Sequence, residues 1–206
     1  MIATDQLRRL NPDLARERAA LFATVLDQAC GEADLSRHLR VCHFLAQVAE
    51  ETGGFRSLVE STAYRDPARL DAIFSNVQGV DHARRLIAAG PTAIGNTIYA
   101  HKNGNGDIAS GDGYRFRGRG FLQITGRANY RRVGAIVGLP LEQEPEQLGE
   151  PGPAAHAAAA YWQARGINTP ADADDASTVT FLVNGTARLH LAQRVAWLGK
   201  AKRIWT

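Results

Sequence analysis

The chain lacks the two features that would place it in a membrane or send it through one by the secretory route. It has no apolar run near the ~18 residues that a membrane-spanning helix needs. Its first residues, Met1–Gln6, show no basic region followed by an apolar stretch, which a cleaved signal peptide would require. We therefore expect a protein that is made in the cytoplasm.

Cysteine is also scarce. The two cysteines, Cys30 and Cys42, match no zinc-binding pattern, and we expect both to be reduced and buried. The six histidines show no metal-ligand spacing. Residues 103–107 imitate the start of a calcium loop, but Ile108 and Tyr114 stand where that loop requires glycine and glutamate. No metal site is expected.

The composition favours one mostly helical domain. A chain of 206 residues can bury a sizeable core, and its hydrophobic content of 45% and charged content of 22% are ordinary for a globular protein. Residues 101–113 predict a surface loop, and 114–125 hold the one strand candidate. Apolar spacing predicts helices over 13–30, 36–50, 66–75, 80–89, 91–99, 127–137, 153–165, 175–183 and 187–204.

Positive charge is concentrated in two places, although the net charge is only +3. One is the segment from Gly113 to Arg132, which has six arginines and no acid. The other lies near the C-terminus and consists of Arg194, Lys200, Lys202 and Arg203. Such clusters suit a polyanionic partner, either nucleic acid or an anionic wall polymer.

Two adjacent acids end one of the predicted helices. That helix is predicted to begin with Ser36 as its N-cap and to stop at Gly53 and Gly54. Glu50 and Glu51 then fall in its last turn, where the aligned carbonyl dipoles disfavour negative charge. A carboxyl group in such a place favours its protonated form, which a general acid needs.

A second carboxylate follows on a different segment, at Glu60. Two acids in unequal surroundings are the minimal equipment of a glycoside hydrolase. The alternative is that these acids are solvated helix-end charges, as most glutamates are. Chemistry alone does not choose between Glu50 and Glu51.

The arginine-rich segment also carries aromatic and neutral polar side chains. Flat faces for sugar rings or bases come from Tyr114, Phe116, Phe121 and Tyr130. Hydrogen bonds for hydroxyl or acetamido groups come from Gln123, Thr125 and Asn129. From the residues alone, carbohydrate binding, nucleic-acid binding and a purely structural turn all stay open.

Four segments together resemble glycoside hydrolase family 19, the family of chitinases and phage endolysins. Ala46-Gln-Val-Ala-Glu-Glu-Thr-Gly-Gly-Phe55 resembles its Ala-Gln-x-x-His-Glu-Ser/Thr-x-Gly-Gly segment, and Leu58-Val-Glu-Ser-Thr-Ala-Tyr64 is similar to the endolysin Glu-Asn-x-x-Tyr segment. Residues 114–130 are similar to the Tyr-x-Gly-Arg-Gly-x-x-Gln-Leu-Thr-x-x-x-Asn-Tyr signature, and 181–185 to the closing Ile-Asn-Gly-Gly segment. The matches run in family order from about residue 40 to the C-terminus.

The resemblance implies a mainly α, lysozyme-like bilobal single domain over residues 1–206, with no cofactor. It makes Glu51 the general acid and Glu60 the base of an inverting reaction, in which the carboxylates stand roughly 6.5–9.5 Å apart. Thr125 would hold the attacking water, and Arg194 would keep Glu60 ionised. Substrate contacts would come from Gln123, Asn129, Tyr114, Asn184 and Arg194.

We predict an endolysin-type peptidoglycan hydrolase, with a chitinase as the alternative and a glycan- or RNA-binding module as a third possibility. As an endolysin it would be a monomer that reaches the periplasmic wall after release, with the help of a holin. It would bind no nucleic acid and would not insert stably into a membrane. One departure from the family is Glu50, which replaces the usual histidine. We expect it to make the local field at Glu51 more negative than in other members.

Overall fold

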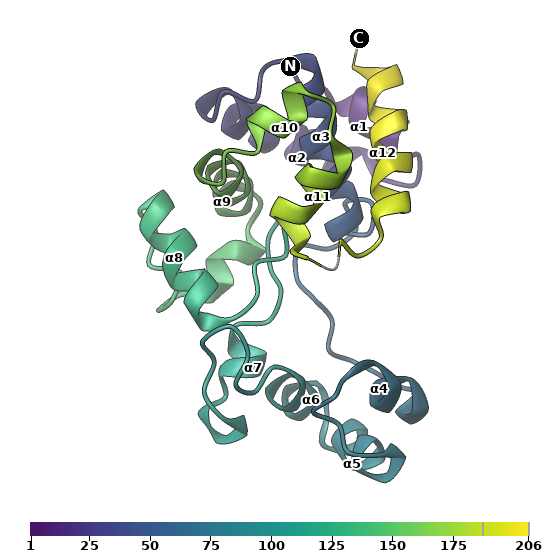
Figure 1. Cartoon of the computed structure of the whole chain (residues 1–206), viewed down its shortest axis with the longest axis vertical. Coiled ribbons are helices and arrows are strands. Elements are labelled where there is room, and N and C mark those ends of the chain that lie inside the picture. Colours follow the sequence, from purple (N-terminus) through teal and green to yellow (C-terminus); the bar gives the residue numbers. More distant parts are fainter. Residues whose placement is uncertain (187, 206) are drawn as a thin grey trace. The chain divides into compact units, whose positions relative to one another are not determined.

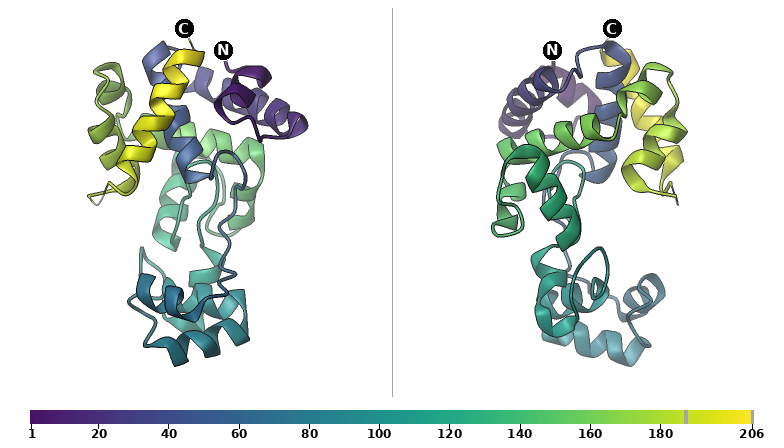
Figure 2. Two further views of the ribbon diagram at one scale, coloured as in Figure 1. Left: turned by 90° about the vertical axis from the view of Figure 1, so that its right-hand side faces the viewer. Right: turned by 60° about the vertical axis from the view of Figure 1, so that its left-hand side comes forward.

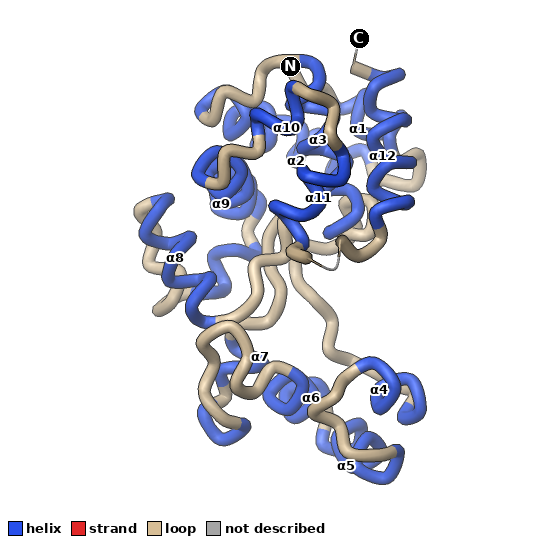
Figure 3. The backbone as a smooth tube through the Cα atoms, in the orientation of Figure 1, coloured by secondary structure: helices blue, strands red, loops and turns tan. Residues whose placement is uncertain are grey.

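The computed structural model describes residues 1–186 and 188–205, and in this part of the chain it contains helices and no strand (Figures 1 and 3). Two isolated antiparallel bridges, Val59 with Arg119 and Arg119 with Ile124, take the place of the expected extended piece. The mainly α fold class is therefore confirmed.

The chain forms two compact units, and each is built from separate stretches of sequence. The first unit comprises residues 1–58, 120–123 and 147–206, and the second comprises 59–119 and 124–146. Because the chain passes from one unit to the other several times, no single linker divides them. This agrees with the sequence, in which no long linker is found.

In the first unit, one central helix is surrounded by others. The central helix α3 (His38–Glu51) has a continuous run of buried residues from Arg40 to Ala49. Helix α12 packs along it, and α10 and α11 also contact it (Figure 2). The remaining helices pair as α2 with α9 and as α1 with both α2 and α12. Their bounds are α1 Thr4–Leu10, α2 Arg16–Glu32, α9 Pro151–Ala164, α10 Asn168–Asp172, α11 Ala176–Asn184 and α12 Leu191–Ile204.

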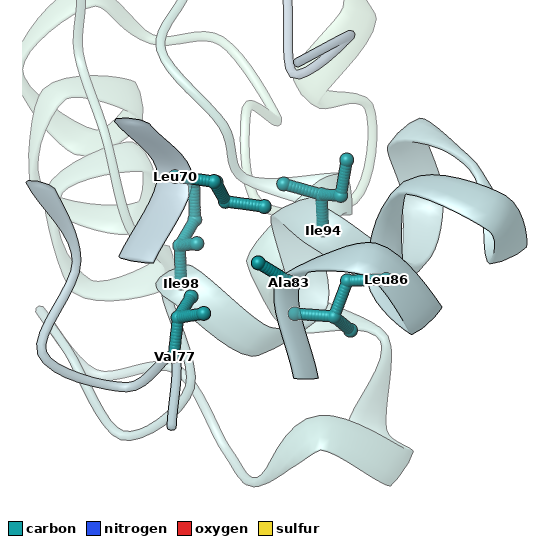
Figure 4. Close-up of a cluster of buried hydrophobic side chains, with 6 residues drawn as sticks. All are labelled: Leu70, Val77, Ala83, Leu86, Ile94 and Ile98. Atoms are coloured by element: carbon teal, nitrogen blue, oxygen red, sulfur yellow. The ribbon is translucent and has the colours of Figure 1, made fainter. Parts of the chain in front are cut away.

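The second unit has its own small core, made where three short helices meet (Figure 4). Two of these helices begin with proline at their first position, where the missing N–H group costs nothing. Its buried side chains are Leu70, Val77, Ala83, Leu86, Ile94 and Ile98. The helices of this unit are α4 Pro67–Ile73, α5 Val80–Ala89, α6 Pro91–Ile98, α7 Asp112–Arg115 and α8 Arg127–Val137, and the 3-10 turns of the chain are η1 Ile108–Ser110 and η2 Pro145–Gly149.

Several helix bounds differ from the sequence predictions. Helices α1, α7 and α10 were not predicted, because each has only four to seven residues and too few turns to show a period. The predicted N-cap Ser36 is wrong, since Arg37 holds that position without a side-chain cap. The last predicted helix starts later, at Leu191, and its expected first residue, 187, lies outside the described residues. No helix in the described ranges is long and apolar enough to cross a membrane.

The two cysteines are free and buried in the first unit, as expected. Because they are buried, we expect the protein to lose stability at alkaline pH. Burial raises the pKa of Cys30 to about 12 and that of Cys42 to about 11. Thiols of the unfolded chain ionise near pH 8.5. The contribution of the two buried thiols to the free energy of unfolding is therefore fully present below that pH and falls as the pH rises toward 11. At pH 10 we expect a loss of about 1–2 kcal/mol for each thiol.

Urea unfolding at pH 8 and pH 10 measures this loss. The variant Cys30→Ala/Cys42→Ala should show a clearly smaller difference between the two pH values. An equal difference in both proteins would mean that other groups cause the alkaline loss.

Candidate active site

Glu51 is the last residue of α3, and the glycine pair after it ends the helix as predicted. Gly53 and Gly54 have φ of 59° and 77°, a region that glycine enters without strain. The N–H groups of Thr52 and Gly54 donate to the carbonyls of Val48 and Ala49, at 3.0 and 2.6 Å. The last carbonyls of the helix are thus occupied, and the Glu51 carboxyl group sits at a fixed helix end.

The Glu51 carboxylate is held by a buried arginine from α12. Arg194 is 3% exposed, and its Nη2 donates to Oε1 of Glu51 at 2.7 Å. Its other donors are also used, because Nη1 donates to Gln47 Oε1 at 2.5 Å and Nε donates to the Leu189 carbonyl at 3.1 Å. Each arm of the guanidinium fork is therefore bound to a protein acceptor.

Arg194 is in turn supported by two further contacts within the first unit. Gln47 lies one turn before Glu51 on α3, and its Nε2 donates to Thr180 Oγ1 of α11 at 3.3 Å. The Leu189 N–H group donates to Oδ1 of Asn184 at 2.7 Å, at the end of α11. Helices α3, α11 and α12 thus fix the ion pair together.

These contacts bear on the predicted roles of Arg194. The prediction that it lies near the acids holds for Glu51, with which its buried guanidinium pairs. Its predicted effect on the ionisation of Glu60 and its predicted contact with substrate stay predictions. Asn184 is half-buried and orients the Leu189 N–H group, and its predicted contact with sugar stays a prediction.

Glu50 has partners of its own. Its Oε1 lies 2.8 Å from Nδ1 of His190, and its Oε2 accepts a hydrogen bond from Nε1 of Trp197 at 3.2 Å. The two neighbouring carboxylates thus have separate partners, and Glu51 is paired with the positive charge of Arg194. The expectation that Glu50 makes the field at Glu51 more negative than in other members of the family stays a prediction.

In the second unit, Glu60 is fixed by backbone and by one tyrosine. Its N–H group donates to the Gly118 carbonyl at 2.8 Å, and its Oε2 accepts from the Gly118 N–H group at 3.0 Å. The Tyr99 hydroxyl donates to Oε1 at 2.6 Å. Both carboxylate oxygens therefore have a hydrogen-bond donor.

Tyr99 stays protonated and can act as that donor over a wide pH range. Burial raises its pKa above the usual tyrosine range, and the Glu60 charge raises it further. Burial likewise raises the pKa of Tyr64, whose ring packs edge-on against Phe74. Tyr99 is not among the predicted site residues, because nothing in its local sequence pattern marks it except its place just after a helix.

The segment from Tyr114 to Tyr130 serves the fold more than predicted. Phe116, Phe121 and Tyr130 are fully buried, so the prediction that they offer flat faces to sugars or bases is wrong. Tyr114 is half-buried, and the Arg117 guanidinium lies 4.1 Å from its ring centroid. Its ring is the one aromatic face of this set that is not enclosed.

The arginines of this segment are largely occupied by other protein groups. Arg119 is buried and donates to the Tyr130 hydroxyl at 2.9 Å. Arg127 pairs with Asp112 at 3.2 Å, and Arg131 forms a two-bonded ion pair with Glu142 at 2.7 Å. Charges paired in this way hold loops together, which favours the structural interpretation over RNA binding.

The three neutral polar residues of the segment keep their predicted roles as predictions. Gln123 has φ of 48°, and its Nε2 donates to the Gly120 carbonyl at 3.0 Å within the first unit. In the second unit, Asn129 Nδ2 donates to the Thr125 carbonyl at 2.7 Å.

In residues 1–186 and 188–205, no three His, Cys, Asp or Glu side chains are grouped closely enough to hold a metal ion.

Solved structures identify the fold as that of bacterial chitinases. Chitinase C from Streptomyces griseus HUT6037 superposes with a TM-score of 0.60 at 17% identity, covering 99% of this chain and 92% of that one. A second bacterial family 19 chitinase gives a TM-score of 0.59 at 19% identity, covering 99% and 94%. At these identities the likeness establishes the fold.

A curated relative establishes the family. A glycosyl hydrolase family 19 domain-containing protein of Haemophilus influenzae is 34% identical over 142 residues, which are 69% of this chain and 68% of that protein. No family model matches the chain. The chain belongs to glycosyl hydrolase family 19 and is a glycoside hydrolase.

Proposed function

We propose that this enzyme is an endolysin-type peptidoglycan hydrolase that cuts β-1,4 glycosidic bonds with inversion. The observation that carries the proposal is that Glu51 and Glu60 are each built into a specific setting: one is paired with Arg194 and the other receives two neutral donors. Solvated helix-end charges would have neither arrangement. The two carboxyl groups thus stand in unequal surroundings, as the acid and the base of a glycoside hydrolase do.

In this reaction, Glu51 gives its proton to the glycosidic oxygen as the bond from C1 to that oxygen breaks. Glu60 takes a proton from water while the water oxygen forms its bond to C1 from the opposite face. Proton exchange with solvent then restores both groups. The Arg194 bond to Oε1 of Glu51 is compatible with this role, because a carboxyl group protonated on Oε2 still accepts at Oε1.

The remaining roles are proposed from the family resemblance. Thr125 would hold the attacking water, and the sugar would be bound by Tyr114, Gln123, Asn129 and Asn184. Peptidoglycan is favoured as substrate by the segment from Leu58 to Tyr64, which is similar to that of endolysins, and by a net charge of +3, which suits an anionic wall.

Chitin is the second candidate substrate. The two solved structures compared above are named as chitinases, one of Streptomyces griseus and one described as a bacterial family 19 chitinase. Chitin and peptidoglycan share a β-1,4-linked amino-sugar backbone, so the same two carboxylates would serve for both.

Mass spectrometry of the products distinguishes these substrates. Purified Gram-negative sacculi and chitin oligomers are each digested, and the new ends are identified. We expect the sacculi to yield muropeptides with a new sugar reducing end, which also identifies the bond cut. Products from chitin oligomers alone would establish a chitinase and overturn the proposal, and cleavage confined to the peptide stems would overturn the glycosidase assignment.

A further inference from the structure

Helices α1 and α12 lie side by side in the first unit (Figure 1). Residues of both helices line a basic hollow there. It has a volume of about 680 Å³ and belongs to neither carboxylate cluster described above. Four of its lining residues are cationic and one is acidic. The lining consists of Asp5, Arg8, Arg9, Pro12, Lys200, Arg203 and Ile204.

Ion pairs with acids among the described residues do not account for the positive charges of this hollow. Arg9 and Arg203 are exposed, and neither forms an ion pair with any acidic residue that the structure describes. Lys200 donates to the Leu10 carbonyl at 2.9 Å, which fixes its ammonium group without cancelling its charge. Asp5, the one acid in the lining, pairs with Arg16 instead.

This sets the hollow apart from the other basic clusters of the chain. Two other cations of the C-terminal cluster do not line the hollow: Arg194 pairs with Glu51, and Lys202 pairs with Asp174. The arginines of the segment from Gly113 to Arg132 likewise contact acids that flank the segment, Asp112 and Glu142, and backbone carbonyls. The C-terminal cluster noted in the sequence therefore divides, and only Lys200 and Arg203 contribute to the hollow.

The hollow continues along α12 toward Glu50, the residue next to the predicted acid Glu51. A second hollow of about 380 Å³ shares Lys200 and Arg203 with the first, and Glu50 and Trp197 also line it. Positions 193, 197, 200 and 203 are three or four apart, so they follow one face of the helix. Lys200 Nζ lies 5.4 Å from the Trp197 ring centroid. We call the two hollows together the α1/α12 groove.

We propose that the α1/α12 groove binds the carboxylate-bearing glycan strand that the enzyme cuts. The half-buried Trp197 offers an apolar ring for a sugar, and the cations beyond it suit the carboxylates of the attached peptide stems. A neutral polymer such as chitin has no carboxylates that could pair with these cations. This inference rests on the proposed function and names the chemistry by which the enzyme would select peptidoglycan.

The test is binding to purified sacculi, with Glu51→Gln in every protein so that the polymer stays intact. The groove variant is Arg9→Gln/Arg203→Gln, and the matched control is Arg84→Gln/Arg85→Gln, two exposed arginines of α5 with the same change of net charge. We expect the groove variant to bind roughly three- to tenfold more weakly at low salt. The control should bind as the parent does. The difference should vanish near 1 M salt or on sacculi whose carboxylates have been amidated.

Equal weakening by the control pair would overturn the proposal, because net charge alone would then explain the effect. Unchanged binding of the groove variant would also overturn it. A third outcome would overturn it as well: the groove variant binds anionic lipid vesicles or a short RNA more weakly than the parent but binds sacculi equally well. Cleavage products are read separately by mass spectrometry of the unmodified enzyme, so a failed proposed function and a failed groove give different results.

Discussion

Replacing Glu51 by glutamine is expected to slow hydrolysis by a factor of roughly 10²–10⁴, the range that a general acid contributes. The amide has no proton to give to the leaving oxygen, although its size is unchanged. Its side-chain oxygen can still accept the 2.7 Å hydrogen bond from Arg194. We therefore expect normal folding and normal binding of the glycan, with the loss in kcat rather than in KM.

The measurement is the rate of release of soluble muropeptides from sacculi, together with thermal unfolding. Glu50→Gln is the matched control, because it makes the same chemical change one residue earlier, in a side chain bonded to His190 and Trp197. Its effect should be far smaller. A large loss in Glu50→Gln with activity kept in Glu51→Gln would exchange the two assignments, and lysis kept in both would remove this helix end from the chemistry.

The helix end that carries this prediction was readable from the sequence because its signals are local. Two glycines after an apolar helical pattern define where the helix stops, and the positive φ of Gly53 and Gly54 confirms it. Helix α8 was predicted over its full length for the same reason. The short helices α1, α7 and α10 depend on packing against distant segments, which a single-sequence pattern does not encode.

The partners of the two carboxylates could not be predicted, because they come from far along the chain. Arg194 is 143 residues from Glu51, and Tyr99 is 39 residues from Glu60. Residue type was informative for the acids, but an arginine or tyrosine at those positions could equally have been exposed. The arginine-rich segment shows the reverse error, since its composition suggested a ligand surface, whereas Arg119 and Tyr130 are buried against each other.

The second prediction concerns Glu60, the proposed general base. Removing the Glu60 carboxylate by Glu60→Ala should also lower kcat by roughly 10²–10⁴, because water is no longer deprotonated as it attacks. The vacated space lies beside the Tyr99 hydroxyl and the Gly118 N–H group, two donors that now lack an acceptor. A small anion such as formate can occupy such a site, so added formate should restore part of the activity in Glu60→Ala.

The same salt should not help Glu51→Ala, because formate at neutral pH has no proton to give and the site beside Arg194 requires a donor to the substrate. Tyr99→Phe is the intermediate case. It keeps the ring in place and removes one of the two donors to Glu60, so its loss should be well below that of Glu60→Ala and insensitive to formate. Rescue of both alanine variants alike would mean that formate acts elsewhere. No loss in Glu60→Ala would show that water is activated by another group.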